Sequence, residues 1–197
     1  MKDIQSIFFV VGGVFLPRIY FAAIQMLEDR GLTVSDKDRI EIHRLENDLL
    51  TAITSENEFF ASLSSVSTVS TPLTRKDFLD KFCIDPGLLA LVSELSLRRE
   101  VVLFSDYPKS WLSEFDRDGT LAAFFSRVVY LEEMGCSNIQ AGIFDQLVLD
   151  HQVRAGECIW VDGDPLRTSM SLRRGIDAII YVDAYLLRRE LQLRSIL

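Results

Sequence analysis

The sequence predicts an α/β protein built on a doubly wound parallel sheet of about five strands, and three observations support this fold class. Five short apolar segments lack strict hydrophobic–polar alternation, as expected of strands that are covered on both faces. Helix-like segments follow the last four of them, and such alternation is typical of parallel sheets. A long helical block separates the first apolar segment from the second, which indicates an insertion after strand one.

The first strand lies in residues 4–16, IQSIFFVVGGVFL, where β-branched and aromatic residues run into a Gly-Gly turn. The chemistry of open α/β sheets lies at the carboxyl ends of such strands. The other strands are expected at residues 100–105, 127–131, 158–162 and 178–182. The helices between and after them are expected at residues 108–115, 140–153, 165–174 and 184–197.

The helical block predicts the division into domains. Its helices are expected at residues 18–30, 36–54, 56–63, 74–82 and 86–97. Asp36 and Thr74 are suitable N-caps, and Gly31 is suited to end the first helix. Residues 1–16 and 98–197 are therefore expected to form the α/β core domain, and residues 17–97 an inserted helical domain.

Charge and composition restrict the partners and the cellular location. The net charge of −8 argues against a nucleic-acid partner, because surfaces that read phosphates are normally basic. The three cysteines (Cys83, Cys136 and Cys158) are an odd count without CxxC spacing, so neither a disulfide framework nor a zinc site is indicated. Cys158 lies in an apolar run and is expected to be a buried thiol. No leader or membrane-spanning run is visible, so a cytoplasmic protein without a membrane partner is expected. The expected partner is therefore an unidentified small molecule or protein.

Three stretches, together with the helical insertion, resemble the haloacid dehalogenase (HAD) superfamily over nearly the whole chain. FVVGGVFL resembles the family's first motif, and VVLFSDYPKSWL resembles the strand that ends in Ser or Thr. IFDQLVLDHQVRAGECIWVDGDP resembles the helix, turn and strand that present the acidic metal-binding residues. The resemblance implies a Rossmann-like sheet and a helical cap.

The same resemblance assigns chemical roles to individual positions, and several residues depart from the family pattern. The nucleophilic aspartate falls on Val10, which cannot form a covalent intermediate. The acid/base aspartate of phosphatase members falls on Gly12, and the conserved lysine falls on Asn138. Ser105 matches the phosphate-binding position.

The fourth motif is partly preserved. Asp162 matches its first acidic position, while the second falls on Gly163, with Asp164 as a possible substitute. The family holds Mg²⁺ through the nucleophile carboxylate, a backbone carbonyl and the fourth-motif acid. With Val10 in place of the nucleophile, any Mg²⁺ site at Asp162 and Asp164 is expected to be weak. Asp162 has an equally good structural interpretation, because Asp satisfies backbone donors in turns.

Two functions follow from this pattern. The first is a HAD-like protein that has lost the covalent phosphatase or dehalogenase chemistry and acts as a binding or interaction module. The alternative is an altered metal-dependent hydrolase for a small phosphorylated or halogenated substrate. In it, Asp162, Asp164 or Asp106 would activate water directly.

Other motifs in the sequence are weaker. FDRDGTL spells a DxDGT signature with Asp116 as nucleophile and Asp118 as acid/base, but a polar, helix-like segment precedes it instead of a strand. A dinucleotide-binding loop at the Gly-Gly turn lacks the GxGxxG spacing. His43 and His151 are expected to be surface residues.

Overall fold

The computed structural model describes residues 3–51, 53–66, 72–80, 84–134 and 141–197. The chain divides into two compact units. One consists of Met1–Leu16 with Ile84–Leu197, and the other is Pro17–Cys83. They are called the sheet unit and the helical unit below.

The described part of the sheet unit contains one five-stranded parallel sheet, in the order β3-β2-β1-β4-β5. The strands are β1 (Ser6–Val10), β2 (Glu100–Ser105), β3 (Arg127–Tyr130), β4 (Cys158–Asp162) and β5 (Asp177–Ile180). Val10 pairs with Phe104 on β2, and Phe9 pairs with Val161 on β4. The predicted fold class is confirmed, and the carboxyl ends of the strands lie at one edge of the sheet.

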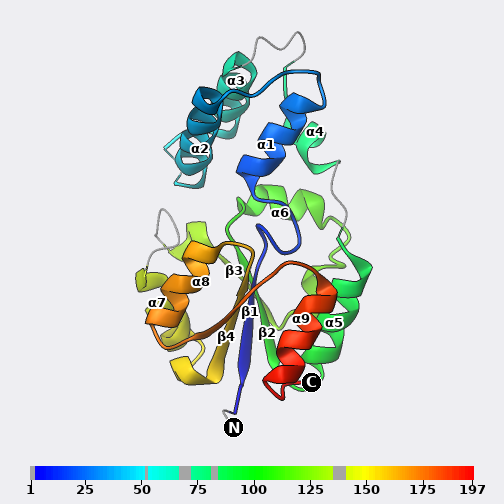
Figure 1. Cartoon of the computed structure of the whole chain (residues 1–197), viewed down its shortest axis with the longest axis vertical. Helices are drawn as coiled ribbons and strands as arrows, with labels where there is room; N and C mark the ends of the chain where they lie inside the picture. Colours follow the sequence, from blue (N-terminus) through cyan, green and yellow to red (C-terminus); the bar gives the residue numbers. More distant parts are fainter. Residues whose placement is uncertain (1–2, 52, 67–71, 81–83, 135–140) are drawn as a thin grey trace. The chain divides into compact units, whose positions relative to one another are not determined.

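Helices cover both faces of this sheet, with α7 (Ala141–Asp150) and α8 (Pro165–Arg173) on one face and α5 (Pro86–Ser96) and α9 (Ala184–Leu193) on the other (Figure 1). Helix α6 (Lys109–Phe115) follows β2, and short 3₁₀ helices lie at Ala122–Phe124, Leu131–Met134 and Ala155–Glu157. Every residue of β1 is buried. An apolar cluster on the α7 side includes Phe8, Val10, Phe104, Phe144 and Trp160. Burial on both faces explains why the strands are apolar throughout.

Helix α5 belongs to the sheet unit, whereas the sequence placed it in an inserted domain ending at residue 97. The helical unit ends at Cys83. Helix α5 contacts β2 and α9 and buries Leu88, Leu91, Val92 and Leu95. These residues form one helical face, and β2 begins four residues after the helix ends. The helix therefore covers the sheet as the crossover segment that leads into β2.

The helical unit contains α1 (Ile19–Glu28), α2 (Asp36–Leu50), α3 (Glu56–Val66) and α4 (Arg75–Leu79). Helix α1 contacts α2 and α4, and α2 contacts α3. Ser35 and Thr74 form capping boxes at the starts of α2 and α4, so the expected cap at Asp36 is one residue late. Among the described helices, none is long and apolar enough to cross a membrane.

Candidate functional site

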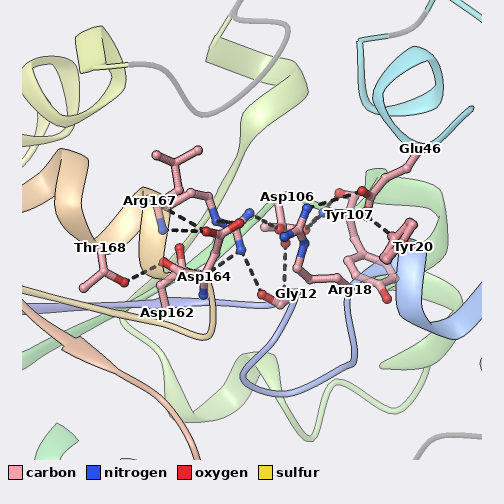
Figure 2. A network of polar contacts seen from close by, with 12 residues as sticks. Gly12, Arg18, Tyr20, Glu46, Asp106, Tyr107, Asp162, Asp164, Arg167 and Thr168 are labelled. Carbon is pink, nitrogen blue, oxygen red and sulfur yellow. Dashed lines mark hydrogen bonds and ion pairs between the residues drawn. The ribbon is translucent and has the colours of Figure 1, made fainter. Parts of the chain in front are cut away.

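The carboxyl ends of β1, β2 and β4 bring together side chains that are far apart in the sequence. Asp106 directly follows β2, Asp162 ends β4, and Gly12 lies in the turn after β1. Arg167, the third residue of α8, extends among them (Figure 2). These four residues are called the Arg167 cluster below.

The guanidinium of Arg167 connects the three strand ends. Its Nη1 donates to Oδ2 of Asp106 at 2.6 Å, and its Nη2 donates to Oδ1 of Asp162 at 2.8 Å. The same Nη2 donates to the backbone carbonyl of Gly12 at 3.0 Å. Burial lowers the pKa of Arg167, but the two carboxylates outweigh burial and raise its pKa above the usual value. The group is therefore a permanent cation that is only 12% exposed.

Asp162 is fully buried, and both of its oxygens have partners. Oδ1 accepts from Arg167 and, at 2.9 Å, from the backbone N–H of Asp164. Oδ2 accepts from the indole Nε1 of Trp160 at 3.0 Å. Burial raises the pKa of Asp162, although Arg167 acts in the opposite direction. Within the described part of the chain, Arg167 is the ionic partner of this carboxylate.

Asp106 occupies the space beside the turn after β1. Its Oδ1 accepts from the backbone N–H of Gly12 at 2.8 Å. A Cβ atom at residue 12 would lie 2.6 Å from Oδ2 and 2.8 Å from Oδ1 of this carboxylate. No side chain fits at residue 12 unless Asp106 moves.

The turn after β4 is equally close-packed and leads into α8. Asp164 is the N-cap of α8, and its Oδ1 accepts from the backbone N–H groups of Leu166 and Arg167. A Cβ atom at Gly163 would lie 2.5 Å from the carbonyl oxygen of Gly13. The close approach of these two turns requires glycine at residue 163. It also fixes the start of α8, from which Arg167 extends.

Comparison with solved structures identifies this architecture. The chain is similar to a predicted HAD-like family hydrolase from Porphyromonas gingivalis, with 22% identity, 98% of each chain covered and a TM-score of 0.68. It is also similar to a HAD family enzyme from Bacteroides thetaiotaomicron in a magnesium complex. That match has 16% identity, covers 95% of this chain and 100% of that one, and has a TM-score of 0.73.

A hydrolase from Streptococcus pneumoniae matches with 16% identity, 98% and 100% coverage and a TM-score of 0.60. The chain has the HAD-like hydrolase fold. No protein-family model matches the sequence, and the search of curated proteins found no match.

Within this HAD-like fold, Val10 lies at the end of β1 with a completely buried side chain. Ser105 ends β2, and its hydroxyl is engaged within its own loop. It donates to the carbonyl of Tyr107 at 2.9 Å and accepts from the N–H of Tyr107 at 3.2 Å. Asn138 lies outside the described residues. The structure thus brings Val10, Gly12, Ser105 and Asp162 to the same edge of the sheet.

The DxDGT segment does not follow a strand. Asp116 is the C-cap of α6, and its carboxylate accepts from the backbone N–H groups of Leu121 and Ala122 at 2.7 and 2.8 Å. Asp116 and Asp118 line a surface hollow of about 440 Å³ beside β2 and β3. The signature lacks the strand that would project its first carboxylate from the sheet.

The expectation for His151 was wrong. Its side chain is 2% exposed, and Nδ1 lies 3.0 Å from Oε1 of Glu100. The ring packs edge-on against Phe8 with centroids 5.0 Å apart. His43 has a 55% exposed side chain on α2. Cys158 is buried as expected, and burial raises its thiol pKa to about 12.

Arg167 is the residue that sequence reasoning missed. A signal was available, since it lies five residues after Asp162 and three after the N-cap Asp164. Residues in the first turn of a helix that follows a parallel strand lie beside the carboxyl edge of the sheet. An arginine there is suited to pair with acids at the strand ends.

Proposed function

We propose that this chain is a HAD-like protein that does not carry out covalent phosphatase or dehalogenase chemistry and that serves as a binding or interaction module. The observation that carries the proposal is Val10. Its side chain ends β1, where the resemblance puts the nucleophile, and is buried in an apolar cluster. A valine side chain has no lone pair with which to attack phosphorus or carbon.

The acids near Val10 are poorly placed to replace it. A general base needs a free oxygen within hydrogen-bond reach of the water that it activates. Asp162 has no exposed surface, and Asp106 is 6% exposed. Each pairs with Arg167, and Asp164 caps α8. The alternative of an altered hydrolase acting through Asp162 is therefore not favoured.

The fold family implies Mg²⁺, and the Bacteroides enzyme is a magnesium complex. With Arg167 in place, the residues here do not fit that ion. Mg²⁺ requires oxygen ligands in near-octahedral geometry. At this edge the oxygens of Asp162 and the carbonyl of Gly12 accept hydrogen bonds, and Val10 offers no oxygen. Among the described residues, no group of three or more His, Cys, Asp or Glu side chains is placed to hold a metal.

The interaction role is supported by exposed apolar side chains in and just after β5. Strand β5 is an edge strand, and Ile180, Val182 and Tyr185 in and after it are 49%, 66% and 68% exposed. These exposed apolar side chains are close together in the sequence, and contiguous apolar surface is typical of sites that contact another molecule. The net charge of −8 favours a partner other than a nucleic acid. We also propose that the helical unit, Pro17–Cys83, corresponds to the helical cap of HAD-like proteins.

A hydrolysis assay tests the proposal. The purified protein is incubated with MgCl₂ and either p-nitrophenyl phosphate or chloroacetate, and release of nitrophenol or chloride is followed. A phosphatase active on p-nitrophenyl phosphate controls for assay conditions. We expect no turnover above the buffer rate. Turnover that Asp162→Asn abolishes would refute the proposal and establish the alternative.

A further inference from the structure

The Arg167 cluster has the composition of a cation site. Three oxygens at the ends of three strands accept from the guanidinium: Oδ2 of Asp106, Oδ1 of Asp162 and the carbonyl of Gly12. Carboxylate and backbone carbonyl oxygens are the ligands that hard cations prefer in proteins. Here the positive charge comes from a side chain of the protein itself.

The geometry of the cluster explains why an arginine can fill this place. Its planar fork carries several donors, so Nη1 reaches Asp106 while Nη2 reaches both Asp162 and Gly12. The carboxylates contribute two negative charges and the guanidinium one positive charge. The N-terminal end of the nine-residue helix α8, with its partial positive charge, lies beside Asp162, which accepts from the N–H of the N-cap residue.

We propose that Arg167 is a built-in cation that takes the place of a metal ion, so that the native protein excludes Mg²⁺ and truncation of Arg167 opens a cation site. The site in the truncated protein would take a small hard cation or a guanidinium ion. This inference rests on the proposed function in one respect, because a protein without a nucleophile has no use for a catalytic metal. It explains how the two acids remain at the strand ends without that metal.

Close packing around the cluster supports this assignment. The carboxylate of Asp106 leaves no space for a Cβ atom at Gly12, and Gly163 lies directly against Gly13. The backbone N–H groups of Gly12 and Asp164 and the indole of Trp160 also donate to the two carboxylates, so Arg167 is not their sole support. Truncating the arginine would therefore leave a cavity lined by oxygens, whose two charges attract a cation.

The test uses cation titrations of the full chain. Wild type, Arg167→Ala and Arg174→Ala are titrated with millimolar MgCl₂, and separately with guanidinium chloride, at ionic strength matched with NaCl. Arg174, just after α8, pairs with the half-exposed Asp145 at 3.1 Å and serves as the matched control. The readout is the melting temperature, with Mg²⁺ binding measured by calorimetry.

We expect Arg167→Ala to bind Mg²⁺ at least about tenfold more tightly than wild type, a difference of about 1.4 kcal/mol in binding free energy. We also expect millimolar guanidinium to raise its melting temperature. Wild type and Arg174→Ala should show neither effect. If both cations leave Arg167→Ala unchanged, or if Mg²⁺ stabilises wild type equally, the inference is wrong.

Should Arg167→Ala fail to fold, the wild-type protein still provides a test. The backbone amides of Gly12 and Asp164 donate to the two carboxylates, so their NMR signals report on cations bound there. We expect these signals to be unchanged by Mg²⁺, and shifts confined to them would overturn the inference. Mg²⁺ binding without hydrolysis would leave the proposed function intact. Hydrolysis in the presence of a chelator would refute only the proposed function.

Discussion

Replacing Arg167 by methionine keeps most of the volume of the side chain and removes its charge. The change leaves Asp106 and Asp162, which are 6% and 0% exposed, without their shared cation. Removing one partner of a buried ion pair costs about 3–5 kcal/mol, because the remaining charge is buried without compensation. A typical domain has a free energy of unfolding of about 5–15 kcal/mol, so this loss is readily measured.

The loss in free energy of unfolding caused by Arg167→Met should depend on pH. An acid whose pKa is higher in the folded than in the unfolded chain binds more protons when folded. The free energy of unfolding then falls as pH rises through the interval between the two pKa values. Burial already raises the pKa of Asp162, and Arg167 opposes this shift. The interval between the two pKa values therefore extends to higher pH in the variant. The free energy of unfolding that the variant loses relative to wild type should be small near about pH 4 and largest near about pH 8.

Urea unfolding followed by circular dichroism measures the loss in free energy of unfolding and its dependence on pH. Arg174→Met is the control, because exposed ion pairs contribute only about 0–1 kcal/mol. The double variant Asp106→Asn/Arg167→Met should be more stable than Arg167→Met at neutral pH, since it carries one less unpaired charge. A loss below about 1 kcal/mol, or a deficit that grows as pH falls, would refute the reasoning from buried charge.

Three further predictions concern other parts of the site and core. Val10→Asp should lower the free energy of unfolding by at least about 3 kcal/mol, because it buries an unpaired carboxylate. It should also produce no p-nitrophenyl phosphate hydrolysis, and measurable turnover would contradict this expectation. Gly163→Ala should cost about 1–3 kcal/mol in urea unfolding because its Cβ would meet Gly13, whereas Gly142→Ala, which has open space, should cost nothing. Cys158 should resist iodoacetamide at about pH 8 in the folded protein, since its thiol pKa is about 12. Peptide mass spectrometry checks this, and rapid labelling before unfolding would contradict it.

The fold could be predicted because each strand is a local, continuous apolar run. Burial on both faces leaves this pattern in the sequence itself, and all five strands form close to their expected positions. The strand ends follow directly, so Val10, Ser105 and Asp162 could be assigned to one edge. Helix α5 was harder to assign, because its apolar face looks the same whether it packs on a sheet or on other helices.

The contacts of the site were less predictable. Arg167 has partners 155, 61 and 5 positions away in the sequence, and no local pattern encodes such a meeting. The burial of His151 also depends on a distant residue, because Glu100 supplies its polar partner. Sequence reasoning therefore placed Val10 at the end of the first strand without identifying the cation at the same edge of the sheet.

The position of β1 in the sheet has a consequence for how the protein is made. This strand is the first in the sequence and the central one in space, with β2 on one side and β4 on the other. During synthesis, the chain of the helical unit follows β1 and is complete before any partner strand has been made. Both hydrogen-bonding edges of β1 stay unpaired until Glu100–Ser105 and Cys158–Asp162 have been synthesised. A nascent chain that stops before Cys158 thus exposes one edge of its most apolar strand to other chains.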